Sequence, residues 1–135
     1  MTLSTLDTKQ RLLVKNALVF TIVSIVCALI AAIYESFSHG VYSYYMLYAF
    51  GFSLAGEVLP SLVLLCMKNP KVPGTYARYF WHSAVAVFSV GSFFKGVLDI
   101  YGTTSRLLKP YPAAGVILTV LAVVSAFVKK DTDTE

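Results

Sequence analysis

The sequence predicts an all-α membrane protein, a single domain over residues 1–135 that crosses a lipid bilayer as a bundle of four helices. Hydrophobic residues make up 57% of the chain and charged residues only 13%, and the mean hydropathy is +0.71. A soluble domain of this size would have too little polar surface to cover itself. The hydrophobic residues also form four stretches, each long enough to cross a hydrocarbon core of about 30 Å as a helix.

The four expected spans are separated by segments rich in turn-forming residues. The spans cover residues 16–34, 41–67, 78–101 and 112–128. The first is longer than the hydrophobic region of a signal peptide and no A-x-A pattern follows it, so we expect it to remain as an uncleaved helix. Thr75 suits the N-cap of the third helix, and Pro112 suits the first turn of the fourth.

Basic residues beside the spans predict the orientation of the chain. One side carries Lys9, Arg11, Lys15, Lys68, Lys71, Arg78, Lys129 and Lys130, whereas the other carries only Arg106 and Lys109. Cytoplasmic loops hold the excess of basic residues, so both termini and the middle loop are expected in the cytoplasm, with the plasma membrane or a bacterial inner membrane as the location. Because the basic residues serve as topology signals, we expect no nucleic-acid partner.

Small residues spaced four apart occur in every expected span and predict close helix packing. They are Ser24, Ala28 and Ala32; Gly51 and Ala55; Ser92 and Gly96; and Ala122 and Ala126. We expect a compact bundle that contacts the lipid bilayer and either a second copy of the chain or another membrane subunit. The two cysteines, Cys27 and Cys66, fall at different depths, so we expect two buried thiols and no disulfide.

Glu57 is a candidate for chemistry, because an ionisable group at the centre of a transmembrane helix costs about 2.5–3.5 kcal/mol to insert. Ser53 and Ser61 lie one turn away on either side, on the same helix face. Pro60 lacks an N–H and clashes with the carbonyl of Gly56, so a kink and a freed carbonyl are expected beside the carboxyl. These oxygens could bind a cation, a proton or a polar ligand. Equally, burial could keep the carboxyl neutral, or a serine or tyrosine of a neighbouring helix could bond to it.

A polar stripe is expected to run along the third span and to face the bundle. Its members are His82, Ser89, Ser92, Gly96 and Asp99, with Lys95 at the edge. Lys95 and Asp99 are four residues apart and can form an ion pair within the helix, which favours a structural role over an entrance for an ion or an anionic group. His82, beside Trp81, is expected to be an ordinary imidazole near the cytoplasmic interface.

Two functions are about equally supported by the sequence. The first is a small transport or ligand- or ion-binding protein that acts as an oligomer, with a central site at Glu57, Ser53 and Ser61 and an outer entrance at Lys95, Asp99 and Ser92. The second is a non-catalytic accessory or assembly subunit of a larger membrane complex. An intramembrane enzyme ranks third, because no catalytic motif occurs. We expect no cofactor and no metal, since His39 and His82 belong to opposite membrane faces.

Overall fold

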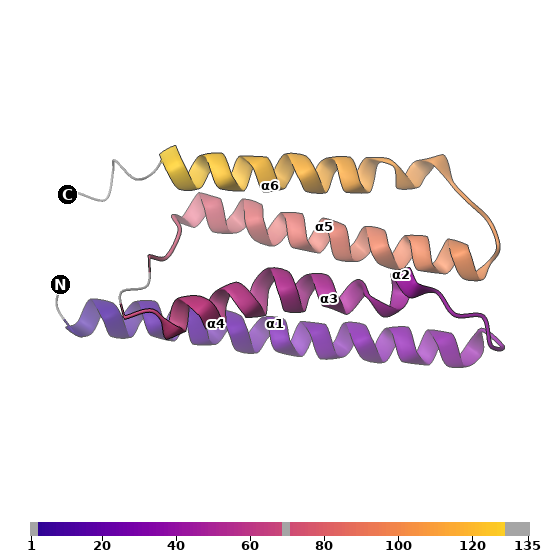
Figure 1. Ribbon diagram of the computed structural model, residues 1–135, viewed down its shortest axis with the longest axis horizontal. Coiled ribbons are helices and arrows are strands. Elements are labelled where there is room, and N and C mark those ends of the chain that lie inside the picture. Colours follow the sequence, from indigo (N-terminus) through magenta and orange to yellow (C-terminus); the bar gives the residue numbers. More distant parts are fainter. Residues whose placement is uncertain (1–2, 69–70, 129–135) are drawn as a thin grey trace.

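The computed structural model describes residues 3–68 and 71–128, and every regular element in these ranges is a helix (Figure 1). In chain order the elements are α1 (Leu3–Phe37), α2 (Tyr44–Leu47), α3 (Ala49–Ser53), the π-helical turn η1 (Leu54–Val58), α4 (Leu59–Cys66), α5 (Thr75–Ile100), the 3₁₀ turn η2 (Arg106–Leu108) and α6 (Pro110–Val128). The prediction of an all-α fold is therefore confirmed.

Among the residues that the structure describes, four helical segments are long and apolar enough to cross a membrane, as the sequence predicts. They are Thr8–Phe37, Tyr44–Cys66, Thr75–Ile100 and Arg106–Val128. The first helix begins well before residue 16, because no glycine or proline interrupts the preceding residues. The N-cap of α5 is Gly74 rather than Thr75, which is already helical. Pro112 lies in the first turn of α6, as expected.

The helices pack in layers that follow the order of the chain (Figure 1). Within the described ranges, α1 packs against the segments from α2 to α4, α2 and α3 pack against α5, and α6 packs against α5 and η2. The described chain begins and ends on the same side of the molecule, here called the terminal end, where α4 also connects to α5. The connections from α1 to α2 and from α5 to α6 lie at the opposite side, the loop end.

The second span is irregular at its middle, as Pro60 predicts. Residues Leu54–Val58 form a π-helical turn directly before α4, in which Pro60 is the second residue. Proline has no N–H for the carbonyl four residues earlier, which belongs to Gly56, and a wider turn accommodates this break in the helical hydrogen bonds. Glu57 lies within the turn. Because π-helical turns inside α-helices occur frequently at functional sites, the carboxyl of Glu57 is a candidate functional group.

Glycines allow close approaches between helices. A Cβ built on Gly96 of α5 would lie 2.6 Å from Met46 Cβ and 2.9 Å from Met46 N. A Cβ built on Gly115 of α6 would lie 2.6 Å from the ring of Phe88. The α2–α5 and α5–α6 contacts therefore depend on residues without side chains at these two positions.

The small-residue stripes are confirmed only in part. Ser24, Gly96 and Ala122 are buried, whereas Ala32 and Ala55 are exposed and do not pack as expected. The buried face of α1 passes instead through Ala17, Ser24 and Ala31. Residues seven apart return to nearly the same helix face after two turns. Over a long contact with a partner helix, they therefore stay on the contact face better than residues four apart do.

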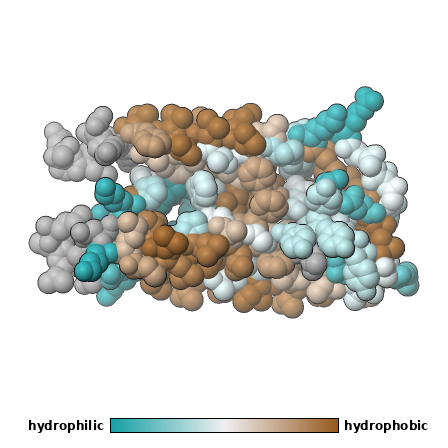
Figure 2. Space-filling view, in the orientation of Figure 1, coloured by the Kyte–Doolittle hydropathy of each residue, from teal (hydrophilic) through white to brown (hydrophobic). Residues whose placement is uncertain are grey.

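Hydrophobic side chains dominate the outer surface. Figure 2 shows them along the long sides of one face, with hydrophilic residues gathered mainly toward its two ends. Exposed hydrophobic residues occur along α1 and α6, among them Ile22, Ile33, Ile117 and Phe127. Such a surface suits a lipid environment. The free thiol of Cys66 is exposed where α4 ends and that of Cys27 is half-buried, so the expectation of two buried thiols is wrong.

Candidate functional site

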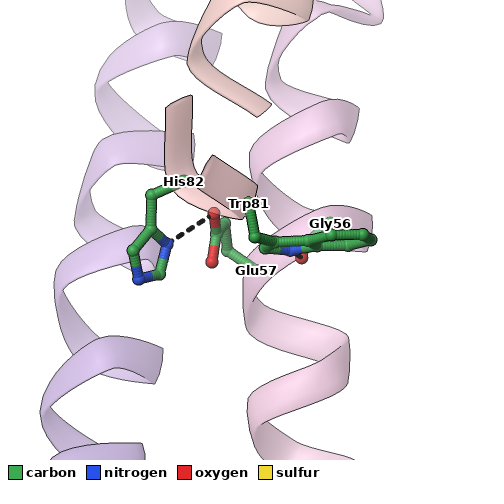
Figure 3. A network of polar contacts seen from close by, with 4 residues as sticks. All are labelled: Gly56, Glu57, Trp81 and His82. Carbon is green, nitrogen blue, oxygen red and sulfur yellow. Dashed lines mark hydrogen bonds and ion pairs between the residues drawn. The ribbon is translucent and has the colours of Figure 1, made fainter. Parts of the chain in front are cut away.

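Glu57 of η1 forms a hydrogen bond with His82 of α5. The distance between Glu57 Oε1 and His82 Nδ1 is 2.8 Å, and the two side chains point toward one another in Figure 3. The Glu57 side chain is only 3% exposed and that of His82 is 28% exposed. The expected alternative, in which a serine or tyrosine of a neighbouring helix bonds to Glu57, is therefore wrong, because the partner is a histidine. The carboxyl of Glu57 thus has an imidazole of another helix as its hydrogen-bond partner.

The positions of the helix ends explain why these two residues meet. Glu57 lies nine residues before the end of α4 at Cys66, and His82 lies seven residues after the start of α5 at Thr75. At 1.5 Å per residue, this difference corresponds to only about 3 Å along the helix axis. The expected boundaries at residues 67 and 78 placed the two side chains about 9 Å apart in depth, because they ended the second span one residue too late and started α5 three residues too late.

Aromatic residues hold the pair in place. The ring of Phe20 in α1 stacks on the imidazole of His82, with ring centroids 5.0 Å apart. The indole Nε1 of Trp81 donates a hydrogen bond to the carbonyl of Gly56 at 2.7 Å (Figure 3). One expectation was that the carbonyl freed by Pro60 serves as a ligand oxygen. In the structure this carbonyl accepts a hydrogen bond from Trp81 of α5. Two neighbouring residues of α5 thus fasten the π-helical turn by two separate hydrogen bonds.

A cavity of about 260 Å³ adjoins the pair toward the terminal end, and it is called the Glu57 cavity below. Side chains from α1, η1, α4, α5 and α6 line it, so every layer of the molecule contributes. Its polar lining residues are Asn16, Glu57, Ser61, Arg78 and His82, with Trp81 also at its wall. The Nε atom of Arg78 is buried and has no hydrogen-bond partner within residues 3–68 and 71–128.

Two further depressions follow α5 toward the loop end. A middle groove of about 580 Å³ has a mostly apolar lining, and an outer groove of about 600 Å³ contains Lys95, Asp99 and Ser92. Phe52 and Phe88 line both grooves. Trp81 lines both the middle groove and the Glu57 cavity, so its indole stands between them.

The polar residues of the outer groove connect α5 to the start of the second span. Lys95 Nζ lies 3.9 Å from Asp99 Oδ1, which agrees with the expected ion pair. The same ammonium lies 4.3 Å from the centre of the Tyr45 ring, and Ser43 Oγ donates to Asp99 Oδ2 at 3.3 Å. Ser92 Oγ donates to the carbonyl of Tyr45. Each of these side chains already has a partner, which favours the structural interpretation of this cluster.

The structure thus separates the residues that the sequence singled out. Glu57 and Ser61 line one cavity, and Lys95, Asp99 and Ser92 line a different groove. Ser53 is buried on the face of Glu57, but the described bond of Glu57 goes to His82. Sequence reasoning missed the roles of His82, Trp81 and Arg78. The position of His82 on the polar stripe of the third span was the one signal that could have indicated a partner for Glu57.

Comparisons of the chain with protein-family models, with curated proteins and with solved structures found no match. The fold and the site by themselves define a class: within the described residues, an all-helical chain has four segments suited to span a membrane, with a buried carboxyl bonded to a half-buried imidazole between two of them. A fold of this kind does not by itself specify a function, which depends on the chemistry of the site.

Proposed function

We propose that the protein is a small membrane transport or ligand-binding protein whose Glu57–His82 pair takes up and releases a proton. The observation that carries the proposal is the buried carboxyl of Glu57, bonded to an imidazole at the wall of a cavity. Ionisable groups at such depth are costly, and in membrane proteins they commonly belong to ion pathways or proton relays. Protonation of this pair would change the charge at the cavity wall and thus the affinity for a solute.

A route for a solute is available along α5. The outer groove, the middle groove and the Glu57 cavity adjoin one another, and neighbouring depressions share lining residues. In this proposal the Trp81 indole is the partition between the middle groove and the Glu57 cavity. Its hydrogen bond to Gly56 would have to open before a solute could pass.

We also propose that the protein acts as a homo-oligomer or together with a partner membrane subunit. Within the described ranges, α6 packs only on α5 and η2, which leaves one side of the layered arrangement without a covering helix. A second copy or another subunit would cover that side.

The proton-uptake proposal predicts a pH response that depends on Glu57. Trp81 is the only tryptophan of the chain and adjoins the pair, so its fluorescence reports on the site. We expect the emission and the melting temperature of the purified protein to change with pH. Glu57→Gln should keep the fold, since the amide has a similar size and can still bond to His82, but should lose that pH response.

Asp99→Asn is the matched control, because it removes a carboxyl from α5 outside the Glu57 cavity. It should retain the wild-type pH response. An equal response in Glu57→Gln would exclude Glu57 as the proton site. Failure of Glu57→Gln to fold would favour the second candidate function, an accessory or assembly subunit, for which the bonds of Glu57 and Trp81 to neighbouring helices are the supporting observation.

For the orientation, we propose that the chain crosses the membrane four times with both termini in the cytoplasm. The excess of basic residues at the terminal end over the loop end supports this. Reporter fusions after Asn69 and after Glu135 should read as cytoplasmic, and a fusion after Thr104 should read as external. The opposite reading at any one of these positions would contradict the four-span arrangement.

A further inference from the structure

The charge of the Glu57 cavity indicates what kind of solute it accepts. Glu57 and His82 neutralise one another when they share one proton, whether as an ion pair or as two neutral groups. Arg78 then remains as the single formal charge among the described residues that line the cavity. Guanidinium stays protonated under all physiological conditions, so the cavity carries a net positive charge whenever the pair holds its shared proton.

The Nε of Arg78, which is unpartnered among the described residues, also indicates that the cavity accepts an anion. Its Nε is buried, yet has no partner within residues 3–68 and 71–128. A buried donor without an acceptor is costly, and a donor of this kind is satisfied best by an oxygen anion. Arg78 also lies in the first turn of α5. The N-cap of this helix is Gly74, which has no side chain to cap the helix. The partial positive charge of that helix end adds to the attraction for an anion.

We propose that the Glu57 cavity binds a small molecule that carries a carboxylate or phosphate group, and that Arg78 holds this group. The proposal rests on the function proposed above and names its ligand class. A volume of about 260 Å³ is small for a ligand pocket, so the solute is a small organic or inorganic anion rather than a large one. Asn16 and Ser61 supply further polar groups at the wall, and the rest of the lining is mostly apolar.

Anion binding and protonation of the pair are linked. The groups that line the cavity together with Glu57 are His82 and Arg78 from α5, Asn16 from α1 and Ser61 from α4, whereas α6 adds only apolar side chains. An anion beside Glu57 favours the protonated pair, and by reciprocity the protonated pair binds the anion more tightly. Affinity should therefore rise as the pH falls.

The test uses the full chain in an uncharged detergent, with inorganic phosphate and benzoate as probes and sodium chloride at equal ionic strength as the reference. We expect both or one of the probes to raise the melting temperature and to change Trp81 fluorescence. Arg78→Gln should weaken that binding at least tenfold. Lys68→Gln is the matched control, because it removes one positive charge beyond the end of α4 from an exposed side chain outside the cavity, and it should bind as the wild type does.

The same oxygen anion could also come from a lipid headgroup. Nanodiscs of phosphatidylcholine and of phosphatidylglycerol distinguish the sources: stabilisation by phosphatidylglycerol alone, lost in Arg78→Gln, would assign the anion to the lipid. No response to either probe or lipid, or an unchanged response in Arg78→Gln, would overturn the proposal. If Arg78→Gln does not fold, Arg78→Lys carries the test, and binding as tight as in the wild type would overturn it because lysine lacks the Nε donor.

Two outcomes distinguish the anion site from the proton site. A pH response that Glu57→Gln abolishes, without any effect of the anions, would leave the proton site and remove the ligand class. Anion binding through Arg78 that is equal at all pH values in the wild type and in Glu57→Gln would keep the anion site and remove the coupled proton.

Discussion

Replacing His82 with phenylalanine is expected to destabilise the folded protein by about 3–5 kcal/mol, because it leaves the buried carboxyl of Glu57 without its partner. Phenylalanine keeps an aromatic ring for the stack on Phe20, so the change removes chiefly the hydrogen bond. If the carboxyl takes up a proton in response, the loss falls to about 1–3 kcal/mol, the cost of an unsatisfied buried polar group.

The double variant Glu57→Met with His82→Phe separates this effect from a change in packing. It removes both polar groups and should recover most of the stability that His82→Phe loses. The measurement is the free energy or the midpoint of unfolding in one detergent for the wild type, both single variants and the double variant. A double variant that is destabilised by the full sum of the single changes would show that the two side chains do not stabilise one another.

Gly96→Ala is expected to produce the second large effect, a loss of about 1–3 kcal/mol or more at the contact between α2 and α5. The added methyl group would lie 2.9 Å from Met46 N and 3.0 Å from Met46 Cα. Backbone atoms of a helix cannot move aside as the end of a flexible side chain can, so α2 has to shift. That shift would also disturb the bond between Ser92 and Tyr45.

Gly51→Ala is the matched control for this prediction, because it adds the same methyl group within α3. A Cβ at Gly51 meets nothing within 4 Å, and alanine favours helix over glycine by up to about 1 kcal/mol. Gly51→Ala should thus melt at the wild-type temperature or slightly above it, whereas Gly96→Ala should melt clearly lower. Equal melting temperatures of the two variants would contradict the close approach of α2 and α5.

Local sequence determined the number of long apolar helices, the irregular middle of the second span and the ion pair of Lys95 with Asp99. Each of these depends on residues that are neighbours in the chain: a continuous apolar stretch, a proline that removes one hydrogen bond, or two charges separated by one helical turn. Such features need no knowledge of how the helices are arranged, so the printed residues suffice to predict them.

Only the tertiary structure decided which side chains meet between helices. The bonds from His82 to Glu57 and from Trp81 to Gly56 each join residues that are 25 positions apart in the chain. They depend on the depth and rotation of α5 relative to the second span, and a shift of three residues at a helix boundary moves a side chain by about 4.5 Å along the axis and turns it by most of a turn. Helix ends predicted from sequence are uncertain by about two to four residues, which is enough to hide the partner of Glu57 and the place of Arg78 at the cavity wall.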